Sequence, residues 1–149
     1  MSVSFSNQLT PNNYPTNARA VIDINFVQTV ALAANSTVAN TNVIDLQQAT
    51  PYPVTEIVNV QILTSASASG TTNSKNVYAV LQVSSDNSNW ANSSIFATQL
   101  LGTDNSGVMA AGSANIKLPP GNPRYIRAQF AGEAGGGTPV ANGTLQLLF

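Results

Sequence analysis

Hydrophobic and polar residues alternate with a period of two along most of this chain, as they do in half-buried β-strands. In residues 20–30, for example, Ile22 and Ile24 alternate with Asp23 and Asn25. No segment shows a sustained helical period of 3.6 residues. The pattern predicts strands at residues 20–30, 41–46, 54–64, 76–85, 94–101, 114–118, 124–130 and 143–149.

Turn-forming segments such as DNSN, GTDNSG and GEAGGGTP separate these predicted strands. About eight short strands with turns between them are typical of a two-layer antiparallel β-sandwich, of the jelly-roll or immunoglobulin-like kind. We therefore predict an all-β fold. A single sandwich domain is expected over residues 20–149, because no repeat or linker divides them.

The first nineteen residues have a different pattern. Pro11 and Pro15 each remove a backbone donor and restrict the residue before them, which favours an extended chain. Scattered apolar side chains in this segment suggest that it becomes ordered by lying on a partner. We predict an extended N-terminal arm over residues 1–19, with contacts made by Val3, Phe5, Leu9, Tyr14 and Arg19.

Charge is scarce in this chain of 149 residues: 7% of them are charged, against about 25% in an average soluble protein. The polar surface must therefore consist mainly of Asn, Gln, Ser and Thr. A net charge of −1 and a pI of about 4.9 provide no basic surface for phosphates, so nucleic acid is not an expected partner. The sequence also lacks a membrane-spanning apolar run, and we expect a protein made in the cytosol.

The sequence is poorly equipped for catalysis, because it contains no histidine and no cysteine. Its six acidic residues are widely spaced and form no acid-pair motif. Residues 85–90, SDNSNW, have the oxygen-rich look of a calcium loop but lack its glycine and its final glutamate. We expect a polar turn there, with Trp90 folded back as a cap on the core. No enzymatic activity, cofactor or metal is predicted.

Two of the five basic residues, Arg124 and Arg127, follow a Pro/Gly loop in PPGNPRYIRAQF, residues 119–130. Strand alternation places Arg124 with Ile126 and Phe130 on the core side, at the mouth of the strand, and Arg127 on the outer face. Two interpretations of Arg127 remain open. It pairs with a carboxylate across the sheet, or it is a fork aimed at a partner's carboxylate or backbone carbonyls.

Three segments resemble, in order and spacing, the capsid cement (decoration) proteins of tailed bacteriophages. They are TNVIDL at 41–46, VLQVSSDNSNW at 80–90, and LPPGNPRYIRAQF with the rest of residues 118–149. The resemblance implies a jelly-roll-like sandwich that binds the outer surface of an icosahedral capsid as a homodimer or homotrimer and stabilises contacts between capsomers. The implied partners are the major capsid protein and further copies of this chain, in a virion assembled in the host cytoplasm.

With the resemblance, four residues outside the arm join the arm residues as expected interface residues: Arg124, Tyr125, Arg127 and Glu133. A second resemblance leaves an alternative open: SSDNSNW and RYIR are also similar to motifs of discoidin-like, carbohydrate-binding β-sandwich modules. Another virion component, such as a tail or fibre protein, is the third possibility.

Overall fold

The computed structural model describes residues 22–32, 37–46, 58–67, 76–93, 99–105, 108–118, 121–135, 137 and 140–148. In this part of the chain the regular elements are all β-strands. None of the described residues belongs to a helix long and apolar enough to span a membrane. The predicted arm, residues 1–19, lies outside the described residues, as do residues 94–98 of one predicted strand.

Eleven strands are described, seven of them with seven residues or more and four with two or three. The predicted number of about eight is close to the number of long strands, and the additional ones are short. The strands are β1 (Ile22–Ala31), β2 (Val38–Asn40), β3 (Ile44–Asp45), β4 (Val58–Thr64), β5 (Asn76–Ser84), β6 (Ala91–Asn92), β7 (Gln99–Asn105), β8 (Val108–Met109), β9 (Gly112–Leu118), β10 (Tyr125–Gly132) and β11 (Asn142–Leu148).

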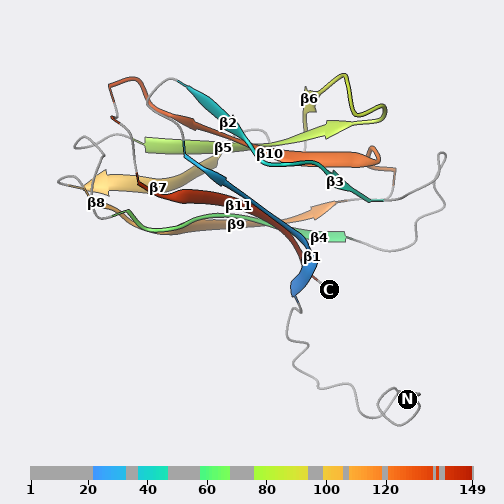
Figure 1. The fold of residues 1–149 in the computed structure, drawn as a ribbon, viewed down its shortest axis with the longest axis horizontal. Coiled ribbons are helices and arrows are strands. Elements are labelled where there is room, and N and C mark those ends of the chain that lie inside the picture. The colour runs from blue at the N-terminus through green and yellow to red at the C-terminus, as the bar shows by residue number, and fades with distance from the viewer. Residues whose placement is uncertain are drawn as a thin grey trace, which may run out of the picture.

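The strands form two antiparallel sheets that lie one over the other (Figure 1). The four-stranded sheet has the order β1-β11-β4-β9, and the seven-stranded sheet has the order β2-β10-β5-β7-β8, with β3 also on β10 and β6 also on β5. Four antiparallel strand pairs are nested along the chain, so that each outer pair encloses the next. β1 pairs with β11, β2 with β10, β4 with β9, and β5 with β7. A chain folded back on itself and then wrapped into two sheets in this way is a jelly roll, which confirms the predicted fold class.

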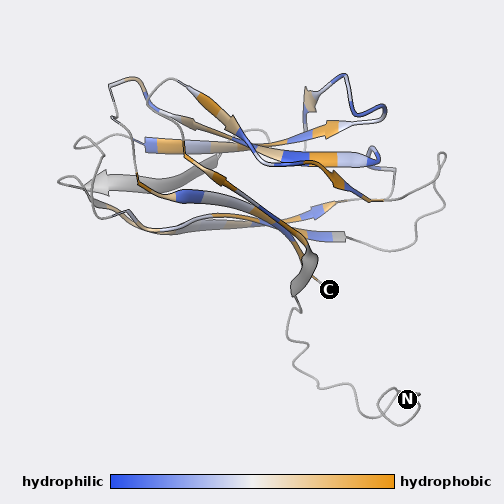
Figure 2. Cartoon of the chain, viewed as in Figure 1, coloured by the Kyte–Doolittle hydropathy of each residue, from blue (hydrophilic) through white to orange (hydrophobic). Residues whose placement is uncertain are grey.

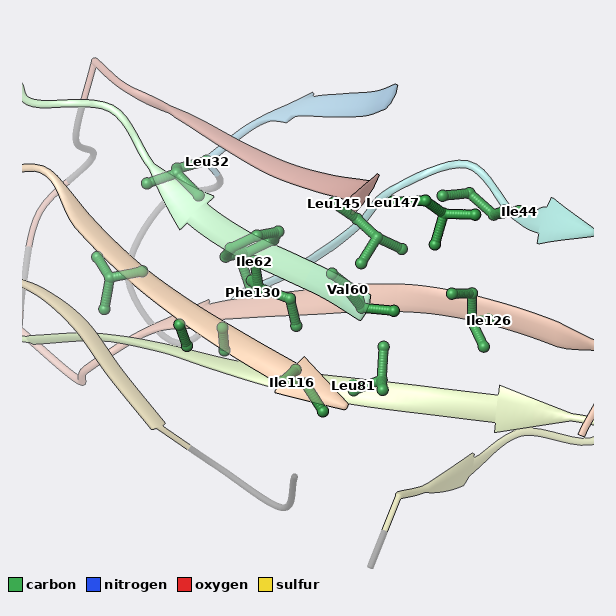
Figure 3. Packing of buried hydrophobic residues seen from close by; sticks show 14 of the residues in the cluster. Leu32, Ile44, Val60, Ile62, Leu81, Ile116, Ile126, Phe130, Leu145 and Leu147 are labelled. Atoms are coloured by element: carbon green, nitrogen blue, oxygen red, sulfur yellow. The ribbon is translucent and has the colours of Figure 1, made fainter. Parts of the chain in front are cut away.

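The core lies between the two sheets and is built mainly from the inward residues of β4, β5, β9, β10 and β11 (Figure 3). Val60 and Leu145 from the four-stranded sheet meet Leu81, Ile126 and Phe130 from the seven-stranded sheet, and all five are fully buried. Figure 2 shows hydrophobic and hydrophilic residues alternating along β10, whereas on β5 the alternation is interrupted by three consecutive hydrophobic residues, Ala79, Val80 and Leu81. Burying one such side chain contributes about 1.5–3 kcal/mol, so these alternating strands hold the sheets together.

Gly143 and Phe130 meet closely between the two sheets. A Cβ atom at Gly143 on β11 would lie 2.5 Å from the Phe130 ring on β10. Real side chains do not approach this closely, so the ring needs a residue without a side chain opposite it. The phenylalanine therefore fills the space that the glycine leaves.

The predicted strand at residues 41–46 is interrupted, and only Ile44–Asp45 of it is a strand. From Asn40 to Ile44 the chain advances four residues while its partner β10 advances three, from Gln129 to Ile126. This extra residue is a β-bulge. The hydroxyl of Thr41 accepts a hydrogen bond from the backbone N–H of Ala128 at 3.0 Å and so replaces a backbone carbonyl in the ladder.

Candidate functional site

The two sheets each turn one side away from the core, and these outer faces are the candidate binding surfaces. We call the outer side of β1, β11, β4 and β9 the amide face and the outer side of β2, β3, β10, β5 and β6 the arginine face. Amide-face residues include Thr29, Asn59, Gln61, Asn115, Lys117, Thr144 and Gln146. Arginine-face residues include Asn40, Asp45, Tyr78, Val80, Gln82, Asn92, Tyr125, Arg127, Gln129 and Ala131.

On the amide face, neutral polar side chains pair across neighbouring strands. The Gln146 side chain donates from Nε2 to Oε1 of Gln61, and the hydroxyls of Thr29 and Thr144 lie 3.1 Å apart. Gln146 is buried although it faces outward, because its neighbours cover it. Such pairs satisfy buried polar groups without the desolvation cost of a charge.

On the arginine face, a row of polar side chains crosses three strands. Arg127 on β10, Gln82 on β5 and Asn92 on β6 are direct cross-strand neighbours. Arg127 donates from Nε to Oε1 of Gln82 at 2.8 Å, and Gln82 donates from Nε2 to Oδ1 of Asn92 at 3.1 Å. Each bond orients the next amide, so the row holds Arg127 in one position.

Trp90 provides the second support of Arg127. The guanidinium carbon lies 4.2 Å from the centroid of the Trp90 ring, within the range of a cation–π interaction. The prediction that Trp90 caps the core is therefore wrong, because Trp90 is half-buried and does not belong to the core cluster. The hairpin between β5 and β6 places this ring on the outer face.

The interpretation that Arg127 pairs with a carboxylate across the sheet is wrong. Its partner on the neighbouring strand is the side-chain amide of Gln82. Within the described residues, no acidic side chain forms an ion pair with it. Burial lowers the pKa of Arg127, although a guanidinium remains charged at neutral pH. The charge is thus partly desolvated and supported only by neutral groups.

Arg124 does pair with a carboxylate of the same chain. Its Nε and Nη2 donate to the two oxygens of Asp45 at 2.7 Å each, in the bidentate geometry that favours Arg–carboxylate pairs. The guanidinium carbon also lies 5.1 Å from the centroid of the Tyr125 ring. The predicted position on the core side is wrong, because Arg124 precedes β10 and its side chain reaches the outward Asp45 on β3.

Residues 85–89 form the polar turn that the sequence predicts, organised by Asp86. Its Oδ1 accepts hydrogen bonds from the backbone N–H groups of Ser88 and Asn89 and from the Ser84 hydroxyl, and its Oδ2 accepts one from the Asn89 side chain. These bonds, led by that from the Asn89 backbone, hold the pKa of Asp86 well below its usual range. The carboxylate is therefore already engaged within its own turn. No group of possible metal-binding side chains occurs among the described residues.

Glu133, at the end of β10, is also engaged within the chain. Its Oε2 accepts hydrogen bonds from the backbone N–H of Asn76 at 3.2 Å and from the Asn76 side chain at 2.8 Å. In return, the backbone N–H of Glu133 donates to the Asn76 carbonyl at 2.8 Å. This reciprocal pair closes the end of the β5–β10 ladder.

A shallow pocket with a volume of about 150 Å³ lies on the arginine face. Ligand pockets are generally larger, about 300–1,000 Å³, so this one suits a single small side chain better than a free ligand. Its walls are mainly apolar, with two amides among them. The lining residues are Tyr78, Ala79, Val80, Asn92, Gln129 and Ala131.

Of the predicted interface residues, the structure brings Tyr125 and Arg127 together on the arginine face, with Arg124 at its edge and Glu133 at the far end of β10. The other five, Val3, Phe5, Leu9, Tyr14 and Arg19, lie outside the described residues. Sequence reasoning missed Gln82, Asn92 and Gln129 as members of this face. Alternation placed Gln82 and Gln129 on the outward side of predicted strands, whereas Asn92 lay outside every predicted strand, and the sequence did not indicate which strand lies next to which.

A scan against known protein families finds no family model that matches this chain. A search of curated proteins finds no match either.

Proposed function

We propose that this chain is a structural protein of a tailed-bacteriophage virion, a cement protein that binds the outer surface of the capsid as a homodimer or homotrimer and has no enzymatic activity. The observation that carries the proposal is that the outer faces have few charged groups available to a partner. Three of the described acidic residues, Asp45, Asp86 and Glu133, form bonds within the chain, and the outer faces consist largely of neutral hydrogen-bonding groups.

Such surfaces suit a protein that must be covered on more than one side. Neutral amides and hydroxyls bond to a partner's backbone and side chains at a smaller desolvation cost than charges do. A jelly roll adds two sheets whose outer sides can lie on a shell or against a neighbouring copy (Figure 1). The resemblance of residues 41–46, 80–90 and 118–149 to cement proteins is the second support.

The carbohydrate-binding alternative is less well supported by the arginine face. Sugar-binding sites use an open aromatic ring for stacking, whereas one face of the Trp90 ring is covered by Arg127. The pocket on this face is also small for a sugar ring and its hydrogen-bonding groups.

The test is binding to capsids that lack the protein. The reading frames beside this gene are expected to encode a major capsid protein, and the purified chain should cosediment to saturation with undecorated capsids built from it. Light scattering of the unbound protein should give a dimer or trimer, not a 15.5 kDa monomer. A chain that does not bind these capsids but binds a defined sugar on a glycan array would contradict the proposal and favour the alternative.

A further inference from the structure

Arg127 has hydrogen-bonding capacity that the chain itself does not use. Its Nε donates to Gln82, and this is its one hydrogen bond within the described residues. A guanidinium has five N–H donors, so four remain for a ligand. A planar fork of this kind matches a carboxylate, with two parallel N–H···O bonds.

The guanidinium is also held in place before any ligand arrives. The Trp90 ring supports its plane, and the row through Gln82 and Asn92 fixes its Nε. An arginine on an open surface loses side-chain freedom when it binds a partner. Here much of that freedom is already lost in the unbound chain, which favours binding.

The positive charge of Arg127 has no ion-pair partner among the described residues. Arg124 and Asp45 neutralise each other, whereas Asp86, on the turn that leads to Trp90, remains ionised and is bonded to neutral groups of that turn. Glu133 lies six residues farther along the strand, roughly 20 Å at the usual rise, which exceeds the screening length of about 10 Å in salt. Among the described residues no carboxylate forms an ion pair with Arg127, so an incoming carboxylate can bind it without displacing one.

The small pocket lies on the same face, farther along β10. Two of its lining residues, Gln129 and Ala131, follow Arg127 at the next outward positions of the strand. These positions are roughly 7 and 13 Å from Arg127 at the usual strand rise. An extended peptide spans such a distance with two to four residues, so it can reach the guanidinium and the pocket at once.

We propose that the arginine face docks an extended acidic segment of a protein partner, with a carboxylate bound to Arg127 and a small apolar side chain in the pocket beside Gln129. This inference rests on the proposed function, under which the partner is the major capsid protein. It assigns the capsid contact to the seven-stranded sheet and leaves the amide face for other contacts.

The first test compares three variants by cosedimentation with undecorated capsids, at low and at high salt. Arg127→Gln removes the charge and is expected to weaken binding by roughly 10- to 100-fold, most strongly at low salt. Arg127→Lys keeps the charge but loses the fork, so it should bind between Arg127→Gln and the wild type. Lys117→Gln, the matched control, removes one positive charge from the amide face and should bind like the wild type.

The second test identifies the ligand directly. In Arg127→Lys the new amine can be joined to a touching carboxylate by a zero-length carbodiimide cross-linker, and mass spectrometry then locates the bond. A cross-link from position 127 to an Asp or Glu of the capsid protein is expected. A cross-link to a second copy of this chain would overturn the assignment to the capsid and identify a contact between cement subunits.

The outcomes separate this inference from the proposed function. If the wild type binds capsids and Arg127→Gln binds equally well, the inference is wrong and the proposed function stands. If the wild type does not bind, both are wrong. Thermal melting and the emission of Trp90, the one tryptophan of the chain, check that each variant is folded. If Arg127→Gln is misfolded, the cross-link from Arg127→Lys decides.

Discussion

The amide face and the arginine face lie on opposite sides of the same core, and both pair neutral amides across strands, Gln146 with Gln61 on one and Gln129 with Asn40 on the other. They differ in the row that contains Arg127. On the amide face Gln61 pairs with Gln146 and Thr29 with Thr144, so both members of each pair are neutral. On the arginine face a charged group takes part in the corresponding cross-strand row, where Arg127 bonds to the neutral Gln82.

The polar groups of a neutral pair satisfy one another's hydrogen bonds, whereas Gln82 satisfies only part of Arg127. Two matched amides or hydroxyls satisfy each other, whereas a guanidinium bonded to a single amide keeps a charge and free donors. The inward sides show no such difference, because both sheets contribute alternating apolar residues to one cluster. Stability therefore depends on both sheets alike, while the features suited to specific recognition lie on one of them.

The largest expected effect concerns the shared core, where the two sheets should be equally sensitive. Gly143→Ala places a methyl group against the Phe130 ring and should lower the free energy of unfolding by about 1–3 kcal/mol, through overpacking. Denaturant melts would measure this change.

The control for this steric interpretation is a double variant with a smaller residue opposite the new methyl group. Gly143→Ala combined with Phe130→Leu should be more stable than the sum of the two single changes predicts, by at least about 1 kcal/mol. Strictly additive effects would show that the two residues do not compete for the same space.

A smaller effect is expected in the coupling free energies of the polar pairs, which should differ between the two faces. A double-mutant cycle with Asp45→Asn and Arg124→Gln should give a coupling of about 0.5–1 kcal/mol, because both side chains are more than one third exposed and water screens the pair. Chemical denaturation of the four proteins provides the coupling.

The matched cycle on the amide face uses Gln61→Ala and Gln146→Ala. Its coupling should be about half as large, since neutral hydrogen bonds are weaker than charge-assisted ones. A stronger coupling between the two glutamines than between Arg124 and Asp45 would contradict the expectation that the charge-assisted pair is the stronger one.

The smallest expected effect is the pH dependence of the turn beside the arginine face. The lowered pKa of Asp86 means that the folded state binds its proton less readily than the unfolded state does. The stability that this carboxylate contributes is therefore fully present above the ordinary aspartate pKa of about 3.9 and is lost as the pH falls below it. The difference in Tm between the wild type and Asp86→Asn should be constant near neutral pH and shrink below about pH 4. A difference in Tm that does not depend on pH would show that the turn does not depend on the ionised carboxylate.

Local patterns in the sequence were sufficient for several features of the structure. Alternation identified most of the long strands and placed Ile126 and Phe130 in the core, as the structure confirms. It missed the short strands β2, β6 and β8, and the predicted turn GTDNSG is wrong in its first part, because β7 continues to Asn105. The polar turn at residues 85–89 followed from Asp, Asn and Ser close together. These features depend on the geometry of a few consecutive residues, which the sequence contains directly.

Only the tertiary structure determined which polar side chains meet. Arg124 and Asp45 are 79 residues apart in the chain, and Arg127 and Gln82 are 45 apart. Their contacts depend on the order of strands in the sheet and on its register, including the bulge at Thr41. A shift by one residue would exchange the two faces of a strand. The sequence assigned the two arginines to different sides of the strand but gave the partner of neither. The fold paired Arg124 with a carboxylate and Arg127 with neutral groups, because neighbouring strands supply those groups.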